Sequence, residues 1–583
     1  MKKTRLLITL SMLVVLCAAC ATPTPEVIEK VVTEIVKEVV KETVIVEGTP
    51  QVVEKEVTKV VEKEVTTVVE KVVTATPAAA AFDPDVLYVA HVQDPPTLDA
   101  HLATSVSEGY MPNFYDRLFE VDRDTGEVVG QLVESWEVSD DGLTYTLVLH
   151  KGVKFHDGTD LDAEAVKFNF ERIMALEAWH ASAWKYIDTI EVVDAHTLQV
   201  TLTEPFALWV DFLVTNPKMI GPQCIKDHEV DGDWAQAWLS ENICGSGPYM
   251  LKVWERGRDI HLVKFDDYWR GWDGKHVSEV HLLNIPEAST QRLMLEAGDL
   301  DVALMYSDDF IPAYESNPDI KLITESPPNQ LYLRLNPNGG PTADKNVRLA
   351  LAYLFDFKSF QELSAFANPR SDGPVPMVLF FDRDTPPEIP YNTFSMEKAQ
   401  EYLAKSDYPD GFKMTIIADP EDARQRPFVL LFQQNAAKLG IEVEIIAEVW
   451  SQTIARGDCK ECQANADDPL FANSFMLYTL PYYPDPAAFL IRMYVTKEAG
   501  GVRNFLWYEN QEVTDLIEQG TKLTDRKKAM DLYWEAIEKI IEDVPDIYVD
   551  RFMVWNPVRT WVQGYSPHVM DQWKWEYYYI WKE

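Results

Sequence analysis

The stretch from residue 134 to residue 159 constrains the fold most, because its apolar side chains follow the pattern of a strand between two turns. Asp140-Asp141-Gly142 predicts the first turn and Asp157-Gly158 the second. Between them, apolar residues recur at every second or fourth position, as a half-buried strand requires. These residues are Tyr145, Leu147, Leu149, Val153 and Phe155. The chain is therefore expected to contain a sheet with one buried face.

A helix is predicted directly after this strand, over residues 163–173. Val166, Phe170 and Ile173 recur there at helical spacing. Asp162 is placed to cap the helix, and Glu164 lies near its positive N-terminal end. Farther on, residues 427–439 predict another helix, which Gly440 ends, and residues 441–446 predict a strand. This alternation indicates an α/β fold with crossover connections.

Length and composition limit the architecture and the partners. A chain of 583 residues is too long for one hydrophobic core, so we expect at least two lobes. Hydrophobic residues make up 46% of the chain, which is typical of a globular protein. The formal net charge of −41, from 53 basic and 94 acidic residues, argues against nucleic acid as a partner, because phosphate binding needs clustered Lys and Arg.

The N-terminus predicts export. Lys2, Lys3 and Arg5 precede an apolar run over residues 6–16, which is too short to span a membrane stably and fits a secretory signal. Cys17-Ala18-Ala19-Cys20 follows and resembles the lipobox of bacterial lipoproteins, although that pattern usually has Leu where Cys17 stands. We predict that residues 1–19 are a signal peptide and that Cys20 carries a lipid anchor. Cleavage nearby by an ordinary signal peptidase is the alternative.

Residues 20–83 predict a low-complexity stalk. Val, Glu, Lys and Thr dominate from residue 26 to residue 76, with a repeat of eight residues from Val52. On a helix, valines four apart would form a stripe that turns slowly around the helix axis and gives only a loose contact surface, and Val also suits strands. We interpret the segment as a spacer that is partly helical or disordered. A coiled-coil stalk is the alternative, although a/d heptads are absent.

Export also favours disulfides among the remaining cysteines. Local pairing predicts bridges between Cys224 and Cys244 and between Cys459 and Cys462, out of three possible arrangements. Cys459-Lys460-Glu461-Cys462 could instead be a functional dithiol. A zinc site there would need two further ligands that nothing nearby supplies.

No catalytic constellation is visible in the sequence. It contains no Gly-x-Ser-x-Gly elbow, phosphate loop or dinucleotide fingerprint. Residues 122–127 begin like a calcium loop but lack the later ligands, so they predict a hairpin turn. His150, His156 and Asp157 do not complete a metal-ligand spacing. We therefore predict neither an enzyme nor a bound cofactor or metal, with a secreted hydrolase or a stalked surface adhesin as alternatives.

The run from residue 134 resembles the extracellular solute-binding proteins of family 5, the oligopeptide, dipeptide and nickel-type receptors of ABC importers. The resemblance extends from about residue 84 to the C-terminus. Further segments that carry it are 94–99, 245–249, 265–271, 347–353, 408–412, 484–486 and 510–517.

This resemblance implies a two-lobed periplasmic-binding-protein fold of type II, in its large form with an extra subdomain, after a signal peptide and stalk. Residues 336–341, rich in turn formers, would be a hinge crossing. The implied parts are a first lobe (84–122, 246–342 and 549–583), an extra subdomain (123–245) and a second lobe (343–548).

The resemblance also implies function. The chain would be a lipid-anchored monomer on the outer face of the cytoplasmic membrane, in the periplasm or at the cell surface. It would capture a ligand by lobe closure and deliver it to an ABC permease. In peptide-binding relatives an Asp takes the α-ammonium of the ligand, but Tyr482 stands at that position here, and Asp485 would cap the following helix.

Aromatic residues are thus the predicted ligand contacts. An aromatic ring can stack on a neutral polar ligand, and a hydroxyl can hydrogen-bond to it. A peptide is favoured by the resemblance, and an oligosaccharide is kept open by the aromatic pocket. Core packing is the alternative for each ring. The predicted ligand-binding residues are Tyr110, Trp450, Tyr478, Tyr482 and Tyr483.

Overall fold

The computed structural model describes most of the chain from Phe82 to Glu583 and the backbone of two strands near the N-terminus. The residues outside this description are 1–27, 47–48, 68–81, 104–108, 124, 177–183, 305–307, 365–367, 420–421, 423, 449, 482, 499–503, 552 and 566–574. The predicted signal peptide and Cys20 therefore lie outside it. The chain divides into two compact units, Met1–Ala80 and Ala81–Glu583.

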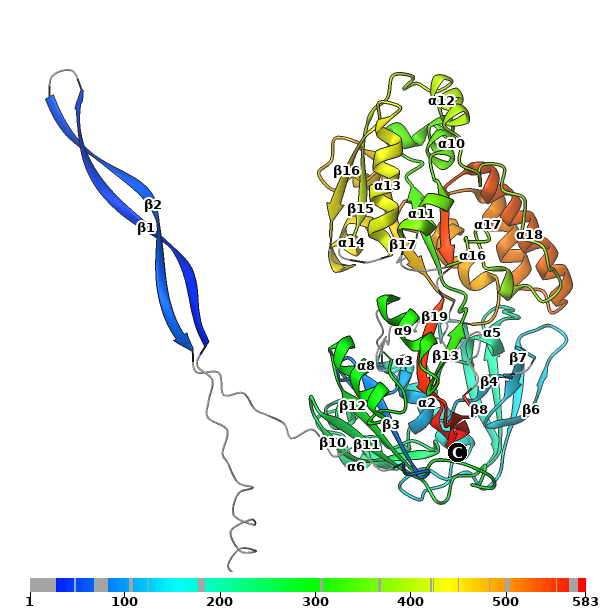
Figure 1. Ribbon diagram of the computed structural model, residues 1–583. Helices are drawn as coiled ribbons and strands as arrows, with labels where there is room; N and C mark the ends of the chain where they lie inside the picture. Colours follow the sequence, from blue (N-terminus) through cyan, green and yellow to red (C-terminus); the bar gives the residue numbers. More distant parts are fainter. Residues whose placement is uncertain are drawn as a thin grey trace, which may run out of the picture. The chain divides into compact units, whose positions relative to one another are not determined.

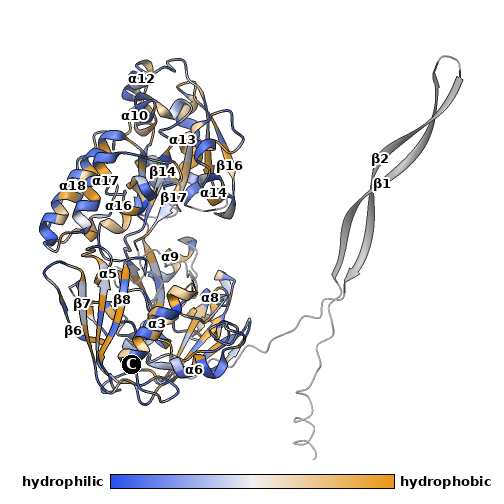
Figure 2. Ribbon diagram, turned by 180° about the vertical axis from the view of Figure 1, so that it is seen from behind, coloured by the Kyte–Doolittle hydropathy of each residue, from blue (hydrophilic) through white to orange (hydrophobic). Residues whose placement is uncertain are grey.

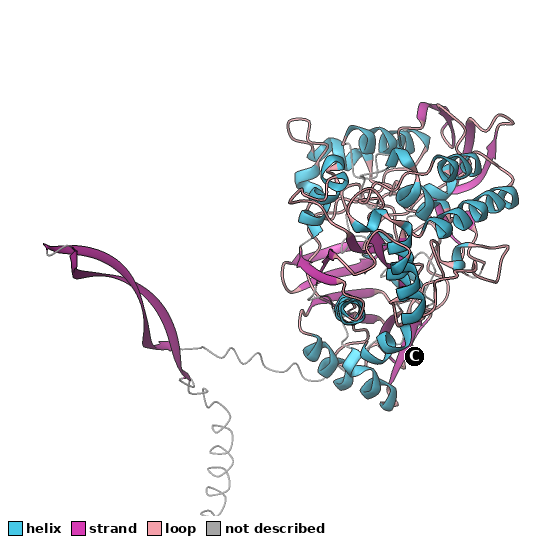
Figure 3. Ribbon diagram, turned by 90° about the horizontal axis from the view of Figure 1, so that it is seen from above, coloured by secondary structure: helices cyan, strands magenta, loops and turns pink. Residues whose placement is uncertain are grey.

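The N-terminal unit contains a long β-hairpin. β1 (Ile28–Val46) and β2 (Thr49–Thr67) pair in antiparallel register from Ile28 opposite Thr67 to Val46 opposite Thr49. The interpretation of this stalk as partly helical or disordered is therefore wrong for these residues. Val, Ile and Thr lose side-chain freedom in a helix and favour strands, and positions four apart fall on one side of a strand. Figure 3 shows the described residues of this unit as strands, whereas the second unit mixes helices and strands.

The first lobe is built on a sheet of order β10-β11-β12-β3. β3 pairs with β12 in parallel, and the other neighbours are antiparallel, so segments from both sides of the extra subdomain share one sheet. The C-terminal segment returns to this lobe through β19, which pairs with β13. The strands are β3 (Val86–His91), β10 (Tyr249–Glu255), β11 (Asp259–Lys264), β12 (Glu279–Asn284), β13 (Ile320–Glu325), β19 (Val554–Arg559), β20 (Val562–Gln563) and β21 (Trp581–Lys582). The helices are α2 (Met111–Phe114), α8 (Ala288–Ala297) and α9 (Ile311–Ser316).

The extra subdomain has its own antiparallel sheet of order β6-β7-β9-β8. A short hairpin, β4 with β5, encloses residues 122–127, which confirms the predicted hairpin turn there. The strands are β4 (Phe119–Val121), β5 (Val128–Gly130), β6 (Val133–Val138), β7 (Thr144–Leu149), β8 (Ile187–Asp194) and β9 (Thr197–Leu202). The helices are α3 (Ala163–Ala175), α5 (Trp209–Phe212), α6 (Pro222–His228) and α7 (Gln236–Leu239).

The strand and helix predicted from residues 134–173 are both present. Buried and half-buried residues alternate along β7, as the period of two requires. The Asp162 carboxylate accepts a hydrogen bond from the backbone N of Ala165 at 2.9 Å, so it caps α3 as predicted.

The second lobe has a five-stranded sheet of order β16-β15-β17-β14-β18. The crossover from β15 through α13 to the parallel β16 confirms the helix and strand predicted around residues 427–446. The strands are β14 (Gln330–Leu335), β15 (Lys413–Ala418), β16 (Glu442–Ala447), β17 (Ser474–Thr479) and β18 (Asp546–Arg551). The helices are α10 (Lys345–Tyr353), α11 (Phe357–Leu363), α12 (Met396–Ala404), α13 (Gln425–Ala437), α14 (Trp450–Gly457), α15 (Lys460–Ala464), α16 (Ala487–Tyr494), α17 (Gln511–Thr521) and α18 (Arg526–Asp543).

The chain crosses between the lobes earlier than predicted. β13 pairs with β19 on the first-lobe side, whereas β14 pairs with β17 and β18 in the second-lobe sheet. The crossings are therefore residues 326–329 and 552–553, and residues 336–341 lie within the second lobe (Figure 1). Turn formers mark an irregular segment, but they do not show which sheet the preceding strand joins.

α18 of the second lobe buries one side and leaves the other to solvent. On α18 the buried residues include Met530, Tyr533, Ile537 and Ile541, spaced three or four apart. Figure 2 accordingly shows hydrophilic and hydrophobic residues together along this helix. Within the described part of the chain, no helix has the length and apolar character needed to cross a membrane.

Candidate functional site

The carboxyl ends of β15, β17 and β18 meet at one edge of the second-lobe sheet. β15 is parallel to β17, and β14 is antiparallel to both β17 and β18, so these three strands run in one direction. β14 starts at the same edge with Gln330, directly after the crossing at 326–329, and β18 ends there before the other crossing. Ligands of open α/β sheets bind at the carboxyl ends of strands. This edge, where both crossings enter the lobe, is therefore the candidate site.

The loop after β15 brings charged groups to this edge. Asp422 Oδ1 accepts a hydrogen bond from the backbone N of Arg424 at 2.8 Å, which fixes the loop before α13. The hydroxyl of Tyr478, on β17, lies 3.5 Å from the same carboxylate oxygen. Desolvation and then the negative charge of Asp422 raise the pKa of Tyr478 well above its usual value. This phenol therefore stays protonated and can donate a hydrogen bond.

Asp550, at the end of β18, is the most deeply buried acid of the site. Its side chain is 1% exposed, and its Oδ2 accepts a hydrogen bond from Asn368 Nδ2 at 2.8 Å. Its Oδ1 has no hydrogen-bond partner among the described residues. Burial raises the pKa of Asp550 to about 6, Asn368 and Arg424 lower it, and Asp422 raises it. A buried carboxylate oxygen without a donor is costly unless a ligand supplies one.

The segment from residue 368 to residue 373 contacts the ends of β14 and β18 and holds the side chains of the candidate site in place. Arg551 N donates to the carbonyl of Pro369 at 3.0 Å, and Arg551 Nη1 lies 3.2 Å from Asp372 Oδ2. Gln330 Oε1 accepts from the backbone N of Asp372 at 3.2 Å. The side chains at this edge are thus held by hydrogen bonds to a rigid sheet. Besides the Arg551–Asp372 ion pair, two carboxylates, one guanidinium and one phenol gather here, a set able to bind an ammonium and a carboxylate of one ligand. They belong to Asp422, Asp550, Arg424 and Tyr478.

Three of the predicted aromatic contacts have described side chains, and of these Tyr478 lies at this edge. Tyr110 is 5% exposed and packs in the first-lobe core, with its ring centroid 5.8 Å from that of His91. Tyr483 is 6% exposed and packs against Phe212 of the extra subdomain, with ring centroids 6.0 Å apart. Tyr482 and the side chain of Trp450 lie outside the described residues. Ligand contact by these rings stays a prediction.

Asp485 supports the local structure in the way expected of it. Its Oδ1 accepts from the backbone N of Ala487, the first residue of α16, at 2.7 Å. Its Oδ2 lies 2.7 Å from Arg526 Nη2, and the same guanidinium nitrogen lies 3.4 Å from Asp211 of the extra subdomain. Burial raises the pKa of Asp211 to about 7, although Arg526 lowers it. These groups join the extra subdomain to the second lobe.

Four residues of the candidate site were not predicted from the sequence, namely Asp422, Arg424, Asp550 and Asn368. A usable signal existed for Asp422 and Arg424, because residues 419–426 form a polar stretch directly before the helix predicted over residues 427–439. Asp550 and Asn368 come from distant parts of the chain, and their approach to the loop depends on the order of strands in the sheet.

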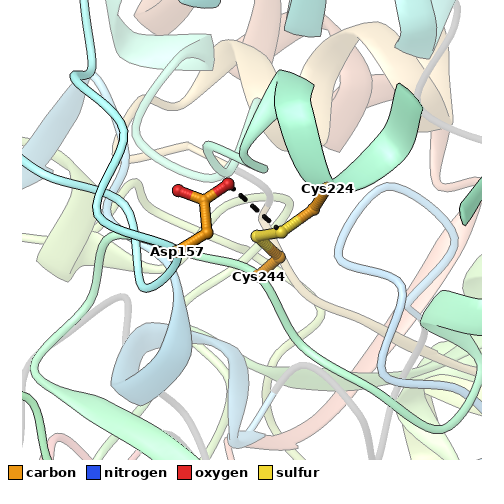
Figure 4. Close-up of side chains that lie close together, drawn as sticks. All are labelled: Asp157, Cys224 and Cys244. Carbon is orange, nitrogen blue, oxygen red and sulfur yellow. Dashed lines mark hydrogen bonds between the residues drawn. A yellow bond between two sulfur atoms is a disulfide. The ribbon is translucent and has the colours of Figure 1, made fainter. Parts of the chain in front are cut away.

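Both predicted cysteine pairs form disulfides in the structure. Cys224 and Cys244 have Cα atoms 6.4 Å apart, and Cys459 and Cys462 have Cα atoms 5.3 Å apart. Asp157 Oδ2 lies 3.4 Å from the sulfur of Cys224 (Figure 4). Although these three residues lie close enough to surround an ion, the bonded sulfurs carry no thiolate, so they offer no metal site.

Comparison with known proteins gives one consistent result. The model of the bacterial extracellular solute-binding proteins, family 5, middle region, matches residues 127–501. A probable D,D-dipeptide-binding periplasmic protein of Escherichia coli K12 is 28% identical over 481 residues, 81% of this chain and 89% of that protein. A glutathione-binding protein of Salmonella paratyphi A is 30% identical over 379 residues, 64% of this chain and 71% of that protein.

Solved structures show the same fold. The HbpA2 protein of Haemophilus parasuis has a TM-score of 0.74 at 22% identity and covers 85% of this chain and 100% of its own. A periplasmic binding protein, DppA, of Helicobacter pylori in complex with the peptide STSA has a TM-score of 0.69 at 24% identity, over 85% of this chain and 98% of its own. These likenesses confirm the predicted periplasmic-binding-protein fold.

The matched region, more than half of the chain, contains most of the second lobe and the run of residues 134–159 that carries the family resemblance. The relatives are binding proteins, so the prediction that this chain is not an enzyme is confirmed. The chain belongs to family 5 of the bacterial extracellular solute-binding proteins, the substrate-binding components of ABC importers.

Proposed function

We propose that this chain captures short peptides with a free α-ammonium group and delivers them to an ABC permease. The observation that carries the proposal is the buried Oδ1 of Asp550, which lacks a donor among the described residues and lies in a site shared with Asp422 and Arg424. An ammonium has three donors and a full positive charge, so it suits two neighbouring carboxylates. The relatives named for dipeptides and glutathione support this choice of ligand class.

Arg424 supplies the opposite charge. Its effect on the pKa values of Tyr478 and Asp550 places its positive charge within electrostatic range of both groups. A guanidinium binds a carboxylate through paired hydrogen bonds. A short peptide carries both charges, so the site suits a zwitterion better than a neutral sugar.

The oligosaccharide alternative receives less support. It needs exposed rings that can stack on a sugar, and Tyr110 and Tyr483 are instead packed in cores. Ligand capture would proceed by closure of the lobes about the crossings at 326–329 and 552–553. Binding then shifts the population toward the closed form, which the permease recognises.

The test compares matched peptides by calorimetry on the full chain. An unmodified short peptide is expected to bind, and N-acetylation of the same peptide should weaken binding by about 2–5 kcal/mol, because it leaves the buried carboxylate of Asp550 without its charged partner. Equal affinity for free and acetylated peptides would contradict the proposed ammonium site, and binding of oligosaccharides alone would overturn the ligand class.

We further propose that the chain acts as a monomeric lipoprotein, held through Cys20 on the outer face of the cytoplasmic membrane. The basic start, short apolar run and small residues before Cys20 support this anchor. Cys20→Ser should move the protein from the membrane to the soluble fraction, because stable anchoring needs its acyl chains. Membrane retention of this variant with unchanged processing would mean that Cys20 is not the anchor.

A further inference from the structure

A second group of ligand-type side chains lies on the first-lobe sheet, away from the edge that carries Asp550. On β11 and β12, His261 and His281 stand directly opposite each other in the antiparallel register. Glu279 lies two residues before His281 and Asp259 two residues before His261. Because side chains alternate with a period of two, all four project from the same face of the sheet. Figure 1 shows the two strands as neighbours.

The contacts within this group are short. The two imidazole rings stack with centroids 4.0 Å apart and planes at 25°. His261 Nε2 lies 2.6 Å from Glu279 Oε2, and His281 Nδ1 lies 2.8 Å from Asp259 Oδ2. One ligand atom each from His261, Glu279 and His281 lies within 4.8 Å of the others. The side chains of these three residues are 12%, 38% and 20% exposed, so an ion can reach them from solvent.

Asp259 prepares His281 for metal binding. An ionised carboxylate only accepts hydrogen bonds, so the proton of this pair sits on His281 Nδ1 and the lone pair is left on Nε2. A carboxylate that holds the far nitrogen of an imidazole is the usual support of a metal-binding histidine. The ring of Tyr88, opposite His281 on β3, stacks on it at a centroid distance of 5.2 Å and limits its rotation.

We propose that His261, Glu279 and His281 form a binding site for a divalent transition-metal ion of the zinc class. Two imidazole nitrogens and one carboxylate oxygen are a recurrent zinc ligand set, with water in the fourth position. Zinc ligands lie about 2.0–2.2 Å from the ion, so small side-chain rotations bring these atoms into range. The ion takes the place of the proton that His261 Nε2 shares with Glu279. On the neutral ring this proton is transferred through solvent to Nδ1, so that Nε2 offers its lone pair to the ion.

The competing arrangement is a set of ordinary hydrogen bonds without an ion. Lys252 Nζ lies 3.7 Å from Glu279 Oε2 and offers that carboxylate a positive partner. This lysine side chain is 53% exposed, so it can swing into solvent when an ion binds. A measurement of zinc binding at these residues therefore distinguishes the two arrangements.

Calorimetry with zinc chloride on the full chain, after treatment with a chelator, tests the proposal. One ion per chain should bind, and His261→Gln and His281→Gln should each weaken binding by at least about 10-fold, because each removes a ligand. Asp259→Asn should weaken it by about 10–100-fold through His281. The matched control is His228→Gln, since His228 stacks on Trp238 outside this group and its loss should leave zinc affinity unchanged.

Cobalt gives an independent measurement on the unaltered chain. A cobalt ion in this ligand set should show the visible absorption of a four- or five-coordinate site, and excess zinc should displace it. Unfolding curves without metal show whether each variant remains folded at the temperature of the titration, so that a loss of zinc affinity reports the removed ligand and not unfolding. Unchanged zinc affinity in both histidine variants, or no binding at micromolar zinc, would overturn the site. These outcomes are independent of peptide binding at Asp550.

Discussion

Asp99→Ala is expected to lower the free energy of unfolding by about 3–5 kcal/mol, because it leaves Arg172 as a buried charge without its partner. Both side chains are fully buried. Arg172 Nη2 lies 2.6 Å from Asp99 Oδ2 and Nη1 lies 3.0 Å from Oδ1, and the guanidinium also donates to the carbonyl of Trp234 at 2.9 Å. Chemical denaturation of the full chain, followed by tryptophan fluorescence, measures the loss.

A surface pair provides the control for this prediction. Lys413 and Glu442 also form an ion pair, at 3.0 Å, but their side chains are 81% and 68% exposed. Glu442→Ala should change stability by no more than about 0.5 kcal/mol. The double change of Asp99→Leu with Arg172→Met should recover part of the loss, because it removes both buried charges. An Asp99→Ala variant as stable as Glu442→Ala would contradict the assigned role of the pair.

The Asp99–Arg172 pair also shows where local sequence patterns stop being informative. The helix over residues 163–175 could be predicted, because its apolar spacing and cap are local features. Nothing in that pattern indicated that Arg172 points inward, since its partner lies 73 residues earlier in the chain. A buried charge is acceptable only with such a partner, and the partner is set by tertiary structure.

The crossing between the lobes was misplaced for a similar reason. Residues 336–341 have the composition of an irregular segment, and the structure has no strand there. Composition does not reveal that β14 pairs with β17 and β18, because these strands come more than a hundred residues later. The secondary structure of the stalk was predicted wrongly for a different reason. Valines four apart fit both one side of a helix and one side of a strand.

The sequence predicted Tyr478 but not the charged groups of the candidate site. The family resemblance implied aromatic ligand contacts, because Tyr482 stands where peptide-binding relatives have an Asp. The carboxylates that the structure provides come from other segments, Asp422 from the loop after β15 and Asp550 from the end of β18. These carboxylates lie close together because parallel strands end at one edge of the sheet. The pattern of one segment cannot predict this, because it does not give the order of the strands.

Asp550→Asn is expected to weaken peptide binding by about 2–5 kcal/mol, or roughly 30- to 4,000-fold in Kd, because it removes a buried charge that pairs with the ligand ammonium. Asn keeps the shape and leaves the oxygen that Asn368 contacts. The matched control is Asp467→Asn, an exposed acid of the same lobe, which should leave Kd unchanged.

The pH dependence of binding gives this prediction a second test. In the free protein the pKa of Asp550 is about 6, and a bound ammonium favours the charged carboxylate, so the pKa is lower in the complex. Peptide affinity should therefore be constant well above pH 6 and fall by up to tenfold per pH unit below it, until the pKa of the complex is reached. In Asp550→Asn this fall should disappear. Unchanged affinity in Asp550→Asn, together with a retained fall below pH 6, would assign the ammonium to another acid. Asp422 is then the candidate, because its negative charge raises the pKa values of both Asp550 and Tyr478.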